Sequence, residues 1–177
     1  HLQSQWNEEN RFNGWIDTPL AEGQSMIAKK LAKKIFQFKI DTIYCSRLFR
    51  NMDTIARILE YDKKYPLFIH LDKGKMKDWG HFIDISINDI PVFVTEKLNE
   101  RHYGKLQGEN KEEMIKKYGE EKVRLWRRSY NIAPPAGESL ADVYKRTNLF
   151  YGKYIKKDLK LGKNVLIVAS HNALRAI

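Results

Sequence analysis

The chain has 177 residues, of which 42% are hydrophobic and 31% charged. This length and balance indicate one soluble domain with a real hydrophobic core, and no apolar run is long enough to cross a bilayer. The formal net charge of +10 leaves three classes of partner open, namely nucleic acid, an anionic membrane and small acidic substrates.

The predicted elements alternate between helices and strands along the chain. The polar residues 1–15 are expected to form a loop. Apolar residues at helical spacing predict helices over residues 24–38, 50–62, 111–130 (with a break near Gly119) and 138–159. Short apolar runs predict strands over residues 40–46, 90–98 and 163–170.

Two stretches differ in how clearly they indicate a structure. Residues 163–170, KNVLIVAS, are typical of a buried strand in a parallel sheet that is covered on both faces. Residues 67–90 are interrupted by Gly74 and Gly80 and follow no single period, so we expect an irregular excursion such as a surface flap. The alternation of strands and helices, without repeats or a linker, favours a single α/β domain over residues 1–177 with a mostly parallel sheet.

Chemically versatile residues follow each predicted strand. Arg50 comes after the first strand, Glu100 and Arg101 after the second, and His171 and Asn172 after the third. Because ligand sites gather at the carboxyl ends of parallel strands, we expect these residues to lie close together. His171 at a helix start suits a phosphate, since free N–H groups point away from that end. A capping or exposed histidine and an ordinary surface arginine are the alternatives.

The segment LNERHYGKLQG is the densest in polar chemistry. With the following helix start it brings together an acid, two cations, an imidazole and a phenol: Glu100, Arg101, His102, Tyr103 and Lys111. Arg127 and Arg128 in WRRSY are each suited to hold a phosphate or carboxylate with two hydrogen bonds. This inventory fits phosphoryl transfer through a nucleophilic histidine, with a carboxylic acid that exchanges the proton. A polar loop at the sheet edge is the alternative.

The distribution of charge favours small acidic substrates. Most lysines lie in segments with helical periodicity, which is typical of solvent-exposed helix faces. Several arginines instead lie in or beside motif-like stretches. Arginines that are scattered along the sequence and converge on folding are more typical of a focused anion pocket than of an extended nucleic-acid-binding surface. We therefore expect no nucleic-acid partner and no membrane partner.

Other common chemistries find little support. There is no cluster of Cys and His at ligand spacing, so no metal is predicted, and there is no P-loop, dinucleotide fingerprint or nucleophile elbow. The single cysteine, Cys45, is expected to be a small buried residue. It has no partner for an internal disulfide, which favours a cytoplasmic location.

Five segments carry a family resemblance: HLQSQWNEENRFNGW, LNERHYGKLQG, WRRSYNIAPP, GESL and HNALRAI. In sequence and in order they resemble the cofactor-dependent phosphoglycerate mutases of the histidine phosphatase superfamily. The resemblance implies a three-layer α/β/α sandwich that interconverts 3-phosphoglycerate and 2-phosphoglycerate through a phosphohistidine. It also implies 2,3-bisphosphoglycerate as the priming phosphoryl donor, small phosphorylated sugar acids as substrates, and assembly as a homodimer or homotetramer.

The resemblance assigns roles motif by motif. His1 corresponds to the phosphorylated histidine, and Arg50 to the phosphate-binding arginine. Glu100 corresponds to the acid/base, and His171 to the second histidine, which stabilises the transferred phosphoryl group. Nine residues correspond to positions that bind substrate or phosphate: Asn7, Asn13, Gly14, Arg101, Tyr103, Lys111, Arg127, Arg128 and Asn172. His102 also matches a family position but is given no catalytic role.

The chain departs from the family pattern around the site. Leu2 stands where a glycine is expected, and a glycine is missing between His171 and Asn172. Together with the absent arginine before His1, these departures predict a domain that is incomplete at both ends, or alternatively a degenerate inactive copy. A histidine phosphatase acting on small phosphomonoesters and a non-catalytic anion or nucleic-acid binder remain further alternatives.

Overall fold

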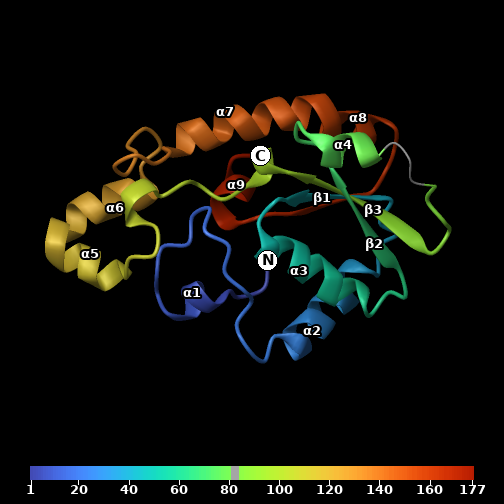
Figure 1. The fold of residues 1–177 in the computed structure, drawn as a ribbon, viewed down its shortest axis with the longest axis horizontal. Helices are drawn as coiled ribbons and strands as arrows, with labels where there is room; N and C mark the ends of the chain where they lie inside the picture. Colours follow the sequence, from blue (N-terminus) through green and yellow to red (C-terminus); the bar gives the residue numbers. More distant parts are fainter. Residues whose placement is uncertain (81–83) are drawn as a thin grey trace.

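A parallel sheet forms the centre of the computed structural model, which describes residues 1–80 and 84–177 (Figure 1). Within these residues its strands are β1 (Thr42–Ser46), β2 (Tyr65–His70), β3 (Asp89–Thr95) and β4 (Val165–Val168). Their spatial order is β2-β3-β1-β4, and every neighbouring pair is parallel. The register places Ile43 between Val92 and Leu166.

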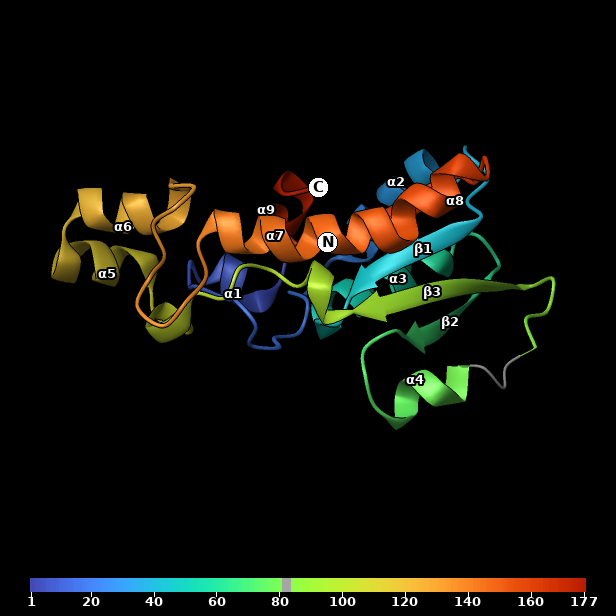
Figure 2. The same cartoon turned by 90° about the horizontal axis from the view of Figure 1, so that it is seen from above.

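Helices cover both faces of the sheet, which confirms the expected three-layer α/β/α sandwich (Figure 2). One face carries α2 (Ser25–Ile35) and α3 (Phe49–Leu59). The other carries α7 (Leu140–Phe150), which continues through a π-helical turn (Tyr151–Ile155) into α8 (Lys156–Lys160). The short α9 (His171–Arg175) follows β4 and packs against α7.

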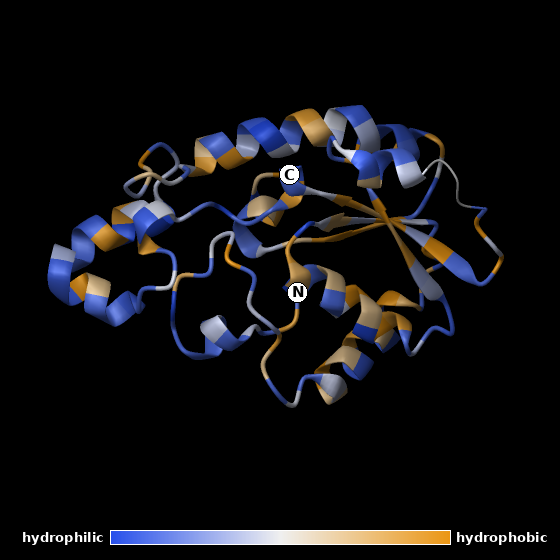
Figure 3. Ribbon diagram, viewed as in Figure 1, coloured by the Kyte–Doolittle hydropathy of each residue, from blue (hydrophilic) through white to orange (hydrophobic). Residues whose placement is uncertain are grey.

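The helices that flank the sheet carry apolar residues, coloured orange in Figure 3, and those of α3 and α7 pack against the strands. Ile55 and Leu59 of α3 pack in one cluster with Ile43 and Val92. On the opposite face, Phe150 packs in a second cluster with aromatic and small residues that include Tyr44, Ala169 and Ala173. Burial of these faces gives each amphipathic helix its place, since removing apolar surface from water is the main favourable term in folding.

Two further helices lie beyond the carboxyl ends of the strands (Figure 1). They are α5 (Lys111–Tyr118) and α6 (Glu120–Arg128). The predicted break falls at Gly119, whose φ of +85° is in the left-handed region that favours glycine. An apolar cluster joins both helices to the N-terminal segment: Phe12, Leu106, Met114, Val123 and Trp126. Single 3₁₀ turns span Glu96–Leu98 and Gly104–Leu106.

The structure corrects the prediction for residues 67–90. Residues 67–70 belong to β2, which pairs with β3 from Tyr65 opposite Asp89 to His70 opposite Val94. The prediction missed this strand because it lies at the sheet edge and is half-buried on both faces, so its sequence neither alternates nor forms a fully apolar run. Residues Lys75–Trp79 form α4. Residues 81–83 lie outside the described part of the chain.

Two smaller expectations also differ from the structure. The N-terminal loop contains one helical turn, α1 (Gln5–Glu8), which buries no residue and so leaves no apolar period to detect. In β4 only Val168 is buried, and Val165, Leu166 and Ile167 are half-buried, so this strand is not covered as predicted. Among the described residues β4 pairs with β1 alone, which places it at the second edge of the sheet.

Candidate active site

A cavity of about 280 Å³ lies at the carboxyl ends of the strands. It is lined by residues from five parts of the chain: His1, Asn7, Arg11, Phe12, Asn13, Gly14, Arg50, Glu100, Tyr103, Lys111, Arg127, Arg128, Ser170, His171 and Asn172. Every predicted site residue except Arg101 is among them. The fold therefore brings together groups that are up to 171 positions apart in the sequence.

The strands deliver three of these groups directly. Arg50 lies in the first turn of α3, just after β1, and His171 is the first residue of α9, just after β4. Glu100 follows β3 after a single 3₁₀ turn. Because the strands are parallel, all three positions fall at the same edge of the sheet, as the sequence predicted.

His1 is held through its neighbour, Leu2. The Nδ1 atom of His1 lies 2.5 Å from the carbonyl oxygen of Leu2, to which it donates in the tautomer that leaves Nε2 unprotonated. The backbone N–H of Leu2 donates to the Thr54 hydroxyl at 3.1 Å, and its side chain is buried in a cluster with Leu20 and Ile58. The apolar residue at this position thus ties the histidine to α3.

Arg50 places a buried cation beside the cavity. Its guanidinium donates to the carbonyl oxygens of Gly14 at 2.8 Å and Ile16 at 3.0 Å. Its Nε atom is buried and has no hydrogen-bond partner among the described residues. Burial lowers the pKa of Arg50, and the nearby carboxylates of Glu100 and Asp17 oppose that effect. A buried donor without a partner is costly, so the guanidinium of Arg50 is incompletely satisfied among the described residues.

Glu100 is buried and held by hydrogen bonds to its carboxylate. Its Oε1 atom accepts from the side-chain amide of Asn172 at 2.7 Å and from the backbone N–H of Arg101 at 2.6 Å. The same amide of Asn172 donates to the hydroxyl of Tyr103 at 3.2 Å. Burial raises the pKa of Tyr103, and the charge of Glu100 raises it further. Asn172 therefore orients the only carboxylate among the described residues that line the cavity.

Cations outnumber that carboxylate. Five line the described cavity wall: Arg11, Arg50, Lys111, Arg127 and Arg128. Burial lowers the pKa of Lys111, and the nearby charge of Arg127 lowers it further. Like charges brought together in this way repel one another unless an anion lies between them. The cavity is thus built to receive a ligand with several negative charges.

The N-terminal loop that lines the cavity is held by hydrogen bonds between its own side chains. The side-chain amide of Asn13 donates to Oδ1 of Asn7 at 2.6 Å and to the hydroxyl of Ser4 at 3.0 Å. Gly14 has a φ of +58°, and a side chain there would overlap the amide of Gln107. The positive φ therefore favours glycine where the loop turns past the cavity.

Arg101 lies behind the cavity wall. It is completely buried and donates to the carbonyl oxygens of Trp126 at 3.1 Å and Arg127 at 2.6 Å, and to Oδ1 of Asn172 at 3.1 Å. The sequence predicted that Arg101 contacts the substrate directly, but the structure places its side chain outside the cavity lining. Instead it joins the end of α6 to Asn172. The motif identified this arginine without distinguishing a lining position from a supporting one.

Three lining residues escaped the sequence prediction: Arg11, Phe12 and Ser170. Arg11 stacks on the ring of Trp6, with Cζ 4.5 Å from the centroid, and donates to the carbonyl oxygen of Gly108 at 2.6 Å. Arg11 lies between Asn7 and Asn13 in the segment HLQSQWNEENRFNGW, and this position was the signal that could have identified it as a lining residue. His102 lies outside the lining, where its Nδ1 atom accepts from the N–H of Gly104.

Residues 1–80 and 84–177 show neither a metal-binding cluster nor a membrane-spanning helix. No group of three or more His, Cys, Asp or Glu side chains in this part of the chain is arranged to hold a metal ion. None of its helices is both long and apolar enough to cross a membrane.

A sequence profile of the histidine phosphatase superfamily (branch 1) matches residues 1–74 and 83–177. The chain therefore belongs to the histidine phosphatase superfamily. Among its relatives are proteins named 2,3-bisphosphoglycerate-dependent phosphoglycerate mutase. The one from Methanococcus vannielii is 44% identical over all of this chain and 76% of its own length. The one from Chlamydia pneumoniae is 42% identical over all of this chain and 79% of its own length.

Solved structures share the fold at lower identity. A phosphoglycerate mutase from Bacillus anthracis superposes with a TM-score of 0.73 at 20% identity, over 99% of this chain and 74% of its own. A mycobacterial glucosyl-3-phosphoglycerate phosphatase superposes with a TM-score of 0.75 at 22% identity, over 99% of this chain and 75% of its own. These likenesses support the architecture.

Proposed function

We propose that this protein interconverts 3-phosphoglycerate and 2-phosphoglycerate through a phosphohistidine at His1, primed by 2,3-bisphosphoglycerate. The observation that carries the proposal is the meeting of two histidines, one buried carboxylate and five cations in a single cavity. The relatives named as mutases, which align over the whole chain, support the choice of substrate.

Transfer to the enzyme begins at Nε2 of His1, which carries the free electron pair while Nδ1 bonds to the Leu2 carbonyl. Nε2 attacks the phosphorus, and the bond from phosphorus to the glycerate oxygen breaks. That oxygen keeps the electron pair of the bond and takes the proton of the Glu100 carboxylic acid. Return transfer reverses these events: a glycerate hydroxyl gives its proton to the Glu100 carboxylate and attacks the phosphohistidine, which frees His1.

The remaining lining residues divide the charge of the substrate between them. Arg50 and His171, which both line the cavity, stabilise the oxygens of the transferred phosphoryl group in this proposal, because those oxygens carry the charge of the transition state. Lys111, Arg127 and Arg128 supply positive charge for the carboxylate and for a second phosphate. Bisphosphoglycerate, when bound, supplies the phosphoryl group that primes His1. The excess of cations over carboxylates among the described lining residues fits such a polyanion.

The proposal is tested by incubating the full chain with 2,3-bisphosphoglycerate and locating phosphohistidine by mass spectrometry. We expect phosphate on His1, and its complete loss in His1→Ala. His102→Ala is the matched control, because His102 lies outside the cavity lining, and it should keep the label. Absence of phosphohistidine in the wild-type chain would contradict the proposal and favour an inactive copy.

Two other outcomes would favour the alternative functions. Rapid release of phosphate from unrelated phosphomonoesters, with no interconversion of phosphoglycerates, would favour a phosphatase. DNA binding that falls steeply with salt, without phosphohistidine, would favour an anion binder. The cytoplasmic location stays a prediction from the single cysteine, and the homodimer or homotetramer stays a prediction from the family resemblance.

A further inference from the structure

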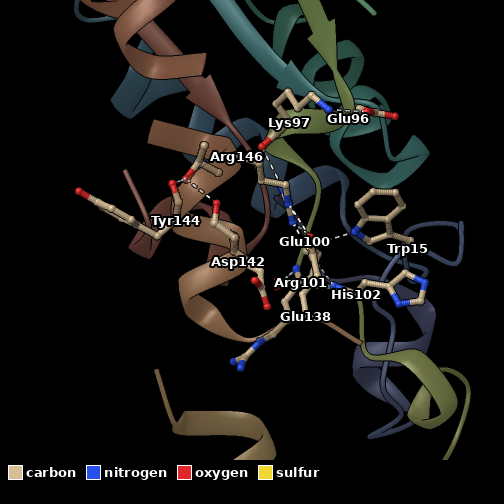
Figure 4. Close-up of polar contacts among 12 residues, drawn as sticks. Trp15, Glu96, Lys97, Glu100, Arg101, His102, Glu138, Asp142, Tyr144 and Arg146 are labelled. Atoms are coloured by element: carbon tan, nitrogen blue, oxygen red, sulfur yellow. Dashed lines mark hydrogen bonds and ion pairs between the residues drawn. The ribbon is translucent and has the colours of Figure 1, made fainter. Parts of the chain in front are cut away.

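A partly buried ion pair lies directly behind Glu100 (Figure 4). Arg146 of α7 donates from Nε to one carboxylate oxygen of Glu138 and from Nη2 to the other, both at 2.9 Å. The side chains are only 13% and 21% exposed. Two parallel hydrogen bonds fix the planes of both groups, which a single contact would not do.

The Arg146–Glu138 pair also holds the backbone on both sides of Glu100. Arg146 donates to the carbonyl oxygen of Lys97 at 2.8 Å and to that of Glu100 itself at 2.9 Å. The carboxylate of Glu138 accepts from the N–H of His102 at 2.9 Å. The backbone N–H of Glu138 donates to the carbonyl oxygen of His102 at 2.7 Å. Residues 97–102 are thus attached to the pair at three positions.

Trp15 completes the arrangement from the other side of the loop (Figure 4). Its indole N–H donates to the carbonyl oxygen of Glu100 at 2.6 Å, so that this oxygen receives donors from both Trp15 and Arg146. The guanidinium of Arg146 also lies over the indole ring, with Cζ 5.7 Å from its centroid. Neither Arg146, Glu138 nor Trp15 lines the cavity. These contacts of Arg146 and Glu138 reach the cavity through the loop that bears Glu100.

We propose that Arg146 and Glu138 are positioning residues that hold Glu100 in the orientation required for proton transfer. The inference rests on the proposed function, in which Glu100 is the acid/base. Proton transfer needs the carboxyl group within hydrogen-bond reach of the reacting oxygen, and a small displacement lowers the rate sharply. Asn172 orients the carboxylate from the front, and the Arg146–Glu138 pair fixes the backbone from behind.

The test compares two leaving groups in the Arg146→Ala variant of the full chain. Mutase turnover expels an alkoxide that must be protonated, so kcat should fall about tenfold to a hundredfold. KM should change little, because the cations of the cavity are untouched. Phosphorylation of His1 by p-nitrophenyl phosphate, followed as a burst of nitrophenolate, needs no proton donor and should stay within about twofold of wild type. An equal loss in both reactions would indicate a merely structural role and overturn the inference.

A double-mutant cycle gives the second readout. If Arg146 acts through Glu100, the variant carrying both Arg146→Ala and Glu100→Gln should be no slower than Glu100→Gln alone. Losses that multiply would overturn the inference. Should Arg146→Ala not fold, as judged by circular dichroism, Glu138→Gln replaces it in the same cycle, because that change keeps the shape of the side chain and removes its charge.

A matched control is available on α3. There Arg57 donates from Nε to both carboxylate oxygens of Asp53, at 3.1 and 3.2 Å, and these are its side-chain hydrogen bonds among the described residues. Arg57→Ala should leave both reactions unchanged. A wild-type chain that forms no phosphohistidine overturns the proposed function and this inference together. A wild-type chain that forms it, with multiplying losses in the cycle, overturns this inference alone.

Discussion

At the scale of single residues, Arg50 combines burial with an incomplete set of hydrogen bonds. Its guanidinium bridges the carbonyl oxygens of Gly14 and Ile16, while its Nε atom stays unpaired among the described residues. The fork thus fixes the loop that lines the cavity and, in the proposed function, also supplies positive charge to the phosphoryl oxygens. A lysine ammonium carries the same charge without the planar geometry that does both.

We therefore expect Arg50→Lys to slow phosphoryl transfer by about tenfold to a thousandfold, the cost typical of losing a preorganised donor to the transition state. The rate of His1 phosphorylation in single-turnover experiments measures this directly. Arg47→Lys serves as the control, because Arg47 is exposed and lies outside the cavity lining. Similar rates for the two variants would argue against a role for Arg50 in stabilising the phosphoryl group.

At the scale of elements, the loop that carries Glu100 and Tyr103 interlocks tightly with the loop that leads into α7. The N–H of Lys105 donates to the carbonyl oxygen of Pro135 at 3.0 Å. Gly104 has a φ of +55°, and a side chain there would overlap the carbonyl oxygen of Pro135. The loop that bears Glu100 and Tyr103 is therefore packed backbone to backbone against the loop that leads into α7. Glycine makes this approach possible.

Comparing Gly104→Ala with Gly119→Ala separates the backbone strain of a positive φ from the steric overlap of the added side chain. Both glycines have positive φ, but nothing lies within 4 Å of a side chain at Gly119. We expect Gly119→Ala to lower the free energy of unfolding by about 1–2 kcal/mol through backbone strain alone. Gly104→Ala should cost at least about 1–3 kcal/mol more, because the loops must move apart. Denaturant unfolding measures both values, and equal losses would contradict the interlock.

At the scale of the whole molecule, part of the positive charge is concentrated at the candidate active site. The chain carries a formal net charge of +10, and five of its cations meet in one cavity that holds a single carboxylate among the described residues. The repulsion between these cations opposes folding. A polyanion that binds the folded chain alone removes the repulsion and shifts the unfolding equilibrium.

Bound 2,3-bisphosphoglycerate should accordingly raise the melting temperature. At a hundred times the dissociation constant the stabilisation is about 2.7 kcal/mol, which corresponds to roughly 5–10 °C for a chain of this size. Thermal unfolding of the His1→Ala variant measures this without turnover of the ligand. Sodium chloride at the same ionic strength is the control, and an equal rise in chloride would show general screening instead of binding.

The sequence by itself determined the positions of the site. Arg50, Glu100 and His171 each lie within a few residues of the end of a short apolar run, and a parallel sheet places all such positions at one edge. The amphipathic helices were equally predictable, because one face of each must be apolar to cover the sheet.

Only the tertiary structure decided the features that depend on contacts between distant segments. Strand β2 is half-buried at the sheet edge, so its place comes from pairing with β3 and leaves no period in the sequence. Arg101 and Arg146 are both arginines near site motifs, yet one ties α6 to Asn172 and the other ties α7 to Glu100. A local pattern records the chemistry of a side chain. Its hydrogen-bond partners, many positions away, are brought within reach only when the chain folds.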